Sequence, residues 1–303
     1  MKKTHIAFAA FSLAACLAAS AGPVGIASGA PSGTNYPMVE DIKNICSTPA
    51  SPITNVITPG GQANIFRVYN DPKVQYGVVP ADVAYFQRLA DEQAGSKRMD
   101  KILMVFPFFS TEFHLLAKDG SKVNSLADLA GKNVVEGPDG SATYITVQLI
   151  KRLTGLQWNG IQASQVDGHK MVLEGRADAE FIVAGKPIAM LQNATGVKLI
   201  NVSHPKLDSF PMYEKTTLDV DGMYPFQKAG ISTYKVDNML VTFAFKNQYQ
   251  AEIGELVTCI TKNIGKMQHP KWRDVDPTNI SRIKWEAHPA AVAAIKKNAK
   301  GGK

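Results

Sequence analysis

Residues 137–144 read Gly-Pro-Asp-Gly-Ser-Ala-Thr-Tyr, and they separate a predicted strand from a predicted helix. Residues 125–136 (SLADLAGKNVVE) are typical of a short helix, a glycine stop and a strand, and apolar residues recur at helical spacing over 145–153. Ser141 or Thr143 can cap the first turn of that helix. The turn is typical of ordinary capping, but its free backbone N–H groups also suit an anionic or carbonyl group of a ligand.

A second turn of this kind lies near the beginning of the chain. Residues 24–29 (VGIASG) predict a strand, residues 30–37 (APSGTNYP) a turn, and the next residues a helix that ends near Cys46. Strands and helices alternate through the chain, and residues 101–107 and 112–117 predict two more strands. Such alternation indicates βαβ units and a parallel sheet, so the sequence predicts an α/β fold.

The N-terminus has the pattern of an export signal. Two lysines precede an apolar run over residues 6–19, and small residues precede Gly22. Cleavage after Ala21 would make residues 1–21 a signal peptide and the mature protein periplasmic. The alternative is lipoprotein processing at the Leu-Ala-Ala-Cys sequence that ends at Cys16, which would leave a lipidated Cys16.

The net charge of +7 at pH 7 is concentrated at the two ends of the 303-residue chain. Residues 266–303 contain nine Lys or Arg and three Asp or Glu, and two lysines lie in the leader. The remainder is close to neutral, so we predict a solvated basic tail and no nucleic-acid partner. The sequence contains no Gly-x-Ser-x-Gly, Cys-x-x-Cys, P-loop or metal-ligand spacing. We therefore predict a protein that is not an enzyme and that needs no cofactor or metal.

Several further motifs occur in an order that resembles one family. They are residues 29–36 (GAPSGTNY), 58–64 (TPGGQAN), 77–83 (GVVPADV), 126–132 (LADLAGK), 137–143 (GPDGSAT), 175–179 (GRADA) and 185–187 (GKP). Together they resemble a TAXI-type solute receptor of the tripartite ATP-independent periplasmic (TRAP) transporters, over about residues 23 to 290.

This resemblance implies a type II periplasmic-binding-protein fold, in which two α/β lobes enclose a cleft and are joined by two hinge crossovers. Residues 22–117 and 236–303 would form lobe 1, and residues 118–235 lobe 2. The protein is then expected to be a monomer that captures a small anionic or polar solute and delivers it to TRAP membrane permease subunits. A binding protein for an ABC importer or a sensor kinase is the alternative, because one fold serves all three.

The resemblance also implies a set of ligand-binding residues. They are Ser32, Thr34, Tyr36, Gln62, Asn64, Asp82, Ser141, Thr143 and Lys186. Lys186 is the only cation among them, and Asp82 could instead cap its helix. The sequence departs from many relatives at Pro80-Ala81, in place of Gln-Ser, and at Gly61-Gln62-Ala63, where relatives have Gly-Ser after Thr-x-Gly. The ligand of those relatives therefore cannot be assumed.

Cys46 and Cys259 would both remain in an exported chain, where two thiols often pair. Pairing requires the two ends of the chain to share a lobe, which the expected fold allows. The alternative is two separate buried thiols.

Overall fold

The computed structural model describes residues 23–218, 222–245 and 249–301. The predicted signal peptide and Cys16 lie outside these ranges. The strands are β1 (Val24–Ala27), β2 (Ile53–Val56), β3 (Tyr76–Pro80), β4 (Ile102–Lys118), β5 (Asn133–Val135), β6 (Asn159–Ile161), β7 (Ala179–Ala184), β8 (Val197–Ile200), β9 (Glu214–Leu218) and β10 (Ile231–Phe243). The α-helices are α1 (Asn35–Cys46), α2 (Gly61–Asn70), α3 (Ala81–Gln93), α4 (Ala142–Thr154), α5 (Gln165–Leu173), α6 (Pro205–Asp208), α7 (Gln250–Asn263) and α8 (Pro289–Gly301). Short 3-10 helices include η1 (Arg98–Lys101), η3 (Ala189–Asn193) and η6 (Pro270–Asp274).

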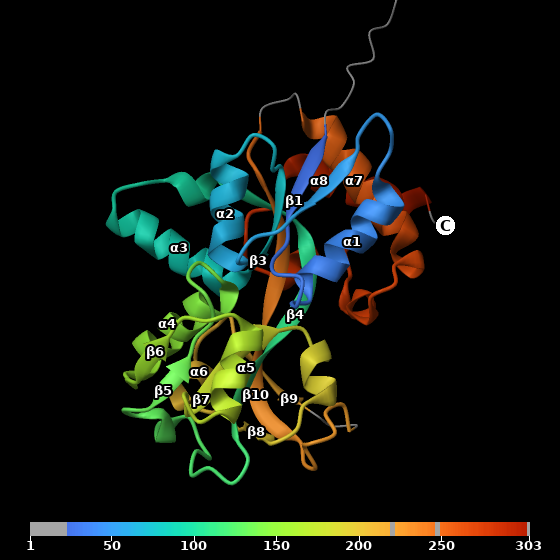
Figure 1. The fold of residues 1–303 in the computed structure, drawn as a ribbon. Coiled ribbons are helices and arrows are strands. Elements are labelled where there is room, and N and C mark those ends of the chain that lie inside the picture. The colour runs from blue at the N-terminus through green and yellow to red at the C-terminus, as the bar shows by residue number, and fades with distance from the viewer. Residues whose placement is uncertain (1–22, 219–221, 246–248, 302–303) are drawn as a thin grey trace, which may run out of the picture.

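The chain forms two α/β lobes that share two long strands (Figure 1). Lobe 1 contains β1–β3 with α1–α3, α7 and α8, and lobe 2 contains β5–β9 with α4–α6. The strand order is β2-β1-β3-β10-β4-β7-β5-β6, in which β4 and β10 are antiparallel to their neighbours. The strands β1–β3 are parallel to one another, as are β5–β7, which fits the helices that connect them. The predicted two-lobe α/β architecture is confirmed.

The strand β4 differs from the sequence prediction, which divided it into two strands. No turn residue interrupts residues 102–118, and Pro107 only coincides with an irregular register against β10. Residues 112–117 pair with β7 of lobe 2, although the sequence analysis assigned them to lobe 1. The division at residues 117 and 235 therefore stays a prediction, and the strand pairing favours a first crossover nearer residue 111.

Helices cover the sheet on both faces, and the apolar residues separate into three cores. One core packs α1, α7 and α8 onto lobe 1 and contains Met38, Phe108 and Val257, all fully buried. A second packs α5 onto lobe 2. The third continues across both lobes, because α2 and α3 of lobe 1 contact α4 of lobe 2. The two lobes are therefore packed against each other on this side.

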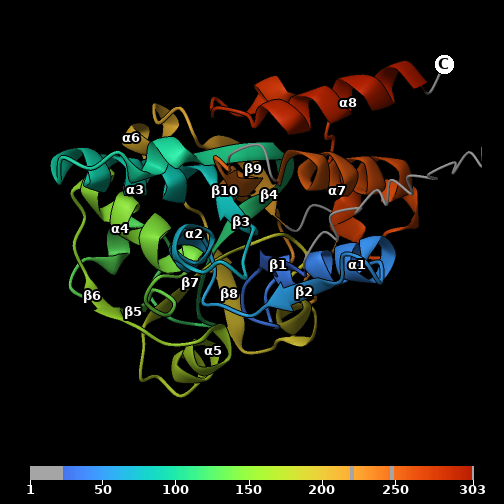
Figure 2. The same ribbon diagram turned by 90° about the horizontal axis from the view of Figure 1, so that it is seen from above.

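A disulfide joins Cys46, the last residue of α1, to Cys259 in α7. The two Cα atoms lie 5.8 Å apart, although 213 positions separate them in the sequence. Figure 2 shows α7 between α1 and α8, with α8 at the outer side of lobe 1. The bridge thus fixes the C-terminal helices to the first βα unit.

Candidate ligand-binding site

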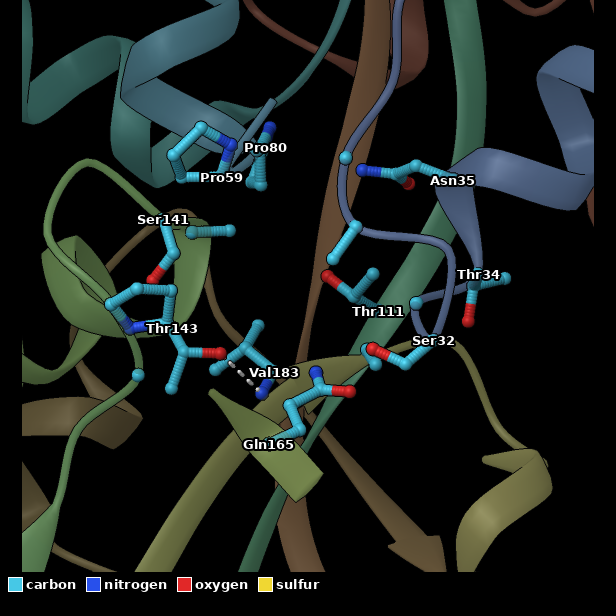
Figure 3. Close-up of a pocket in the computed structure, with 18 of the residues that line it drawn as sticks. Ser32, Thr34, Asn35, Pro59, Pro80, Thr111, Ser141, Thr143, Gln165 and Val183 are labelled. Atoms are coloured by element: carbon cyan, nitrogen blue, oxygen red, sulfur yellow. Dashed lines mark hydrogen bonds between the residues drawn. The ribbon is translucent and has the colours of Figure 1, made fainter. Parts of the chain in front are cut away.

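The candidate ligand-binding pocket lies between the two lobes, and the two glycine-rich turns identified in the sequence form its walls. Its empty space is about 720 Å³, with open solvent at the mouth included. Lobe 1 contributes most of the loop at residues 29–35 together with Pro59, Gly60 and Pro80. Lobe 2 contributes Gly137, Pro138, residues 141–143 and the start of α5. Figure 3 shows Ser32 and Thr34 on one side and Ser141 and Thr143 on the other.

The lobe 2 wall is the turn that precedes α4. Gly137 and Gly140 have φ angles of 78° and 72°, which glycine adopts without strain. Ser141 is the helix N-cap, and its Oγ accepts a hydrogen bond from the Tyr144 N–H at 3.1 Å. Thr143 Oγ1 accepts from the Val183 N–H at 3.0 Å, which ties the turn to β7. Both hydroxyl groups accept these bonds, so their protons remain for a partner in the pocket.

The lobe 1 wall is the loop between β1 and α1. Thr34, the residue before α1, donates its hydroxyl proton to the Gly185 carbonyl of lobe 2 at 3.0 Å. Ser32 is exposed at the mouth. On the opposite side of the mouth, the Ala63 N–H donates to the Gly140 carbonyl at 3.1 Å. The lobes therefore touch at both edges of the pocket.

The two crossing strands form the floor. Thr111 of β4 and Asn238 of β10 line the pocket where the strands pass from one lobe to the other. Asn238 is completely buried, and its Nδ2 donates to the Phe109 carbonyl at 3.0 Å. Its Oδ1 has no hydrogen-bond partner within the described part of the chain.

Four of the nine predicted site residues line this pocket, namely Ser32, Thr34, Ser141 and Thr143. Lys186 does not, because its Nζ donates to the Thr217 carbonyl at 2.7 Å and its backbone N–H donates to Glu112. This position removes the one cation that the sequence analysis offered to a carboxylate. Among the residues that the structure describes, the pocket lining contains no charged side chain.

Tyr36, Gln62 and Asn64 also lie outside the lining. Gln62 and Asn64 are two residues apart on α2, so their side chains diverge by about 200° and cannot both face one pocket. Gln62 donates to Gln87 of α3 at 2.8 Å. Asn64 is completely buried and donates to the carbonyls of Ser28 and Val78, so it joins α2 to β1 and β3.

Asp82 joins the lobes instead of lining the pocket. It is the second residue of α3 and is completely buried. It accepts hydrogen bonds from two lobe 2 hydroxyls, Thr146 Oγ1 at 2.7 Å and Tyr213 OH at 3.0 Å. Burial raises the pKa of Asp82 to about 6, against the opposing effect of these hydrogen bonds. The contact therefore depends on a carboxyl group that titrates close to neutral pH.

Sequence reasoning missed five polar residues of the lining: Asn35, Thr111, Ser164, Gln165 and Asn238. Gln165 follows the N-cap Ser164 at a third strand-to-helix turn, a signal that the sequence contained. An amide in the apolar stretch 236–243 is also unusual enough to have marked Asn238. Thr111 gave no comparable signal, because its position depends on the register between β4 and β10.

A family model described as the NMT1-like family matches residues 26–276. The chain belongs to the NMT1-like family. Its fold is also that of solved periplasmic binding proteins. A structure of the periplasmic binding protein BugD is 13% identical with a TM-score of 0.54, over 92% of this chain and 95% of that one.

Two further structures show the same fold. A periplasmic transporter is 11% identical with a TM-score of 0.55, over 93% of this chain and 94% of that one. The substrate-binding protein of an amino acid ABC transporter is 10% identical with a TM-score of 0.51, over 84% and 98%. These similarities establish the two-lobe type II periplasmic-binding-protein fold, at identities too low to transfer a ligand.

Metal-binding clusters and membrane-spanning helices are two further features of interest. Within residues 23–218, 222–245 and 249–301, no group of three His, Cys, Asp or Glu side chains is placed to hold a metal ion. No helix in those ranges is both long enough and apolar enough to cross a bilayer.

Proposed function

We propose that this protein is an extracytoplasmic receptor that captures a small polar solute between its two lobes and delivers it to a membrane permease. The observation that carries the proposal is the pocket in which Ser32 and Thr34 of lobe 1 face Ser141 and Thr143 of lobe 2. Pockets between domains are common ligand sites, and hydroxyl groups that keep a proton to donate at a helix start suit a polar ligand.

Binding is coupled to closure in this proposal. Among the described strands, the lobes share only β4 and β10, so a rotation about the crossing near Thr111 and Asn238 would open the pocket. A solute that contacts both walls binds the closed form more tightly than the open form. It therefore shifts the population toward the closed form, which a permease can recognise.

The permease that we propose is of the TRAP type, on the basis of the TAXI-like motif order in the sequence. The similarity to an amino acid ABC transporter's binding protein favours a second candidate, a receptor for an ABC importer. Co-purification of the mature chain with each class of permease distinguishes the two.

Solution scattering tests the receptor proposal directly. A thermal-shift screen with amino acids and organic acids would first identify a ligand, since a ligand that binds only the folded state raises the melting temperature. We expect the radius of gyration from the scattering profile to decrease when that ligand is added. Identical profiles with and without a saturating ligand would contradict closure.

A blocking variant tests the location of the site. Ser32→Trp puts a large ring at the pocket mouth from an exposed position, so the fold should tolerate it. We expect the ligand-induced thermal shift to disappear. The matched control is Ser281→Trp, since Ser281 is also exposed but lies outside the pocket lining. Loss of binding in both variants, or in neither, would place the site elsewhere.

A further inference from the structure

Three side-chain amide oxygens in the pocket lining have no hydrogen-bond partner within the described ranges. They are Asn35 Oδ1 from the start of α1, Gln165 Oε1 from the start of α5 and Asn238 Oδ1 from β10. All three oxygen atoms are shielded from solvent, so each lacks water as well as a protein donor. A buried acceptor that stays unpaired costs free energy, so such atoms in a pocket indicate a missing donor.

The orientation of two of these amides is fixed by neighbouring carbonyl groups. Asn35 Nδ2 donates to the Ser28 carbonyl at 3.3 Å, and Asn238 Nδ2 donates to the Phe109 carbonyl at 3.0 Å. Each NH₂ group therefore has a carbonyl partner in the protein, and the oxygens are left for a ligand. For Gln165, Oε1 likewise has no hydrogen-bond partner among the described residues.

The turn before α4 presents hydrogen-bond donors to the pocket, in contrast to the acceptor oxygens of the three amides. Ser141 and Thr143 each accept a backbone hydrogen bond and retain a hydroxyl proton, at the positive end of the α4 dipole. This wall is suited to a carboxylate or carbonyl group, while the amide oxygens are suited to N–H donors.

The charge balance restricts the solute further. Within the described residues the lining has neither a Lys or Arg for an extra negative charge nor an Asp or Glu for an extra positive one. An ion with net charge would lose its hydration without a compensating side chain.

From these observations we infer that the pocket takes a small solute of zero net charge that carries N–H donors together with a carboxylate or carbonyl group, as a zwitterionic amino acid does. The N–H group would bind the oxygens of Asn35, Gln165 and Asn238, and the carboxylate would bind the turn at Ser141. This inference rests on the proposed receptor function and names the class of solute for the same pocket.

Matched pairs of probes test the inference in the mature wild-type protein by calorimetry. We would compare amino acids that have uncharged side chains with the 2-hydroxy acids of the same carbon skeleton, for example L-alanine with L-lactate. Each pair replaces the ammonium group by a hydroxyl and changes the net charge from zero to minus one. We expect at least one amino acid to bind about tenfold or more tightly than its hydroxy counterpart.

Gln165→Glu tests the inference by the direction in which the affinity for an ammonium-bearing probe changes. A carboxylate at the first residue of α5 suits the helix dipole, so the variant should fold. We expect tighter binding of the best ammonium-bearing probe, by about tenfold, because a charge-assisted bond replaces a neutral one. Gln165→Met, which removes the acceptor, should weaken the same probe by about tenfold. The control Gln157→Glu changes an exposed residue of lobe 2 outside the pocket lining and should change neither affinity.

Each outcome decides between the inference and the broader proposal. If hydroxy acids or dicarboxylates bind as tightly as amino acids, or if Gln165→Glu weakens or leaves unchanged the binding of an amino acid, the solute class is wrong while the receptor proposal stands. If no amino acid binds at millimolar concentration, the solute class is also wrong. Only the absence of binding and of closure across the full solute screen would overturn the receptor proposal itself.

Discussion

Gly61 provides the sharpest test of closure, because a side chain at this position of lobe 1 would collide with the backbone of lobe 2. A Cβ atom added at Gly61 would lie 2.7 Å from the Ala142 nitrogen and 2.8 Å from its Cα. Ordinary contacts of this kind begin near 3.4 Å, so Gly61→Ala requires the lobes to separate locally by about 0.7 Å. The 3.1 Å hydrogen bond from the Ala63 N–H to the Gly140 carbonyl would then stretch beyond hydrogen-bond reach.

Loss of that bond and of the surrounding packing should destabilise the closed form by about 1–2 kcal/mol. Since the ligand binds the closed form, we expect the apparent dissociation constant to rise by about 5- to 30-fold. Gly61 also has a φ angle of 39°, so alanine there adds backbone strain. That strain is present in the open form too, and it lowers the melting temperature without changing the closure equilibrium.

The control for backbone strain is Gly155→Ala. Gly155 has a φ angle of 77° and no neighbour within 4 Å of an added Cβ, so it reports the strain alone. Calorimetry with the ligand from the screen would measure both variants. An affinity of Gly61→Ala that matches that of Gly155→Ala would refute the reasoning, because the lobes would then not need this contact to hold the ligand.

Three further predictions follow from buried groups and from the disulfide. The pKa of Asp82 is raised to about 6, so the stabilisation that this carboxyl group gives to the closed form is complete below the ordinary pKa of 3.8 and is lost as pH rises through 6. Ligand affinity should therefore be higher at pH 5 than at pH 7.5. In calorimetry, Asp82→Asn should remove that difference. Burial raises the pKa of Glu180 to about 9, from 4.5, so the free energy of unfolding falls as pH rises between these values. In urea titrations at pH 7, Glu180→Gln should therefore raise the free energy of unfolding by on the order of 3 kcal/mol. The control Glu174→Gln, at an exposed position, should not raise it. The double variant Cys46→Ser/Cys259→Ser opens a loop of 213 residues, and the free energy of unfolding should fall by up to about 5 kcal/mol. Equal stability with and without the bridge would show that the disulfide does not constrain the unfolded chain.

The general architecture could be predicted from the sequence because it depends on local signals. Alternating strands and helices indicated the two α/β units, and the glycine turns before Ser141 and Thr34 placed one pocket wall in each lobe. A residue at the start of a helix is positioned by its own turn, so local signals were enough to place Thr34 and Ser141 beside the pocket, and their role in binding stays a prediction.

The other predicted site residues lie outside the pocket lining because their orientation depends on distant partners. Asn64 faces the sheet because β1 and β3 present carbonyls to it, and Lys186 turns to β9 because Thr217 offers its carbonyl there. The floor residue Asn238 is placed by the register between β10 and β4, which no local pattern specifies. The position of the crossover in β4 also depends on pairing with distant strands, so the predicted lobe boundary stays a prediction.

Amide hydrogen exchange with and without the solute tests the central claim most directly, since that claim is that one solute contacts both lobes together. The account predicts slower exchange in residues 29–36 of lobe 1 and in residues 137–144 of lobe 2, with the same dependence on solute concentration. Protection confined to one of these segments, or absent from both, would contradict it.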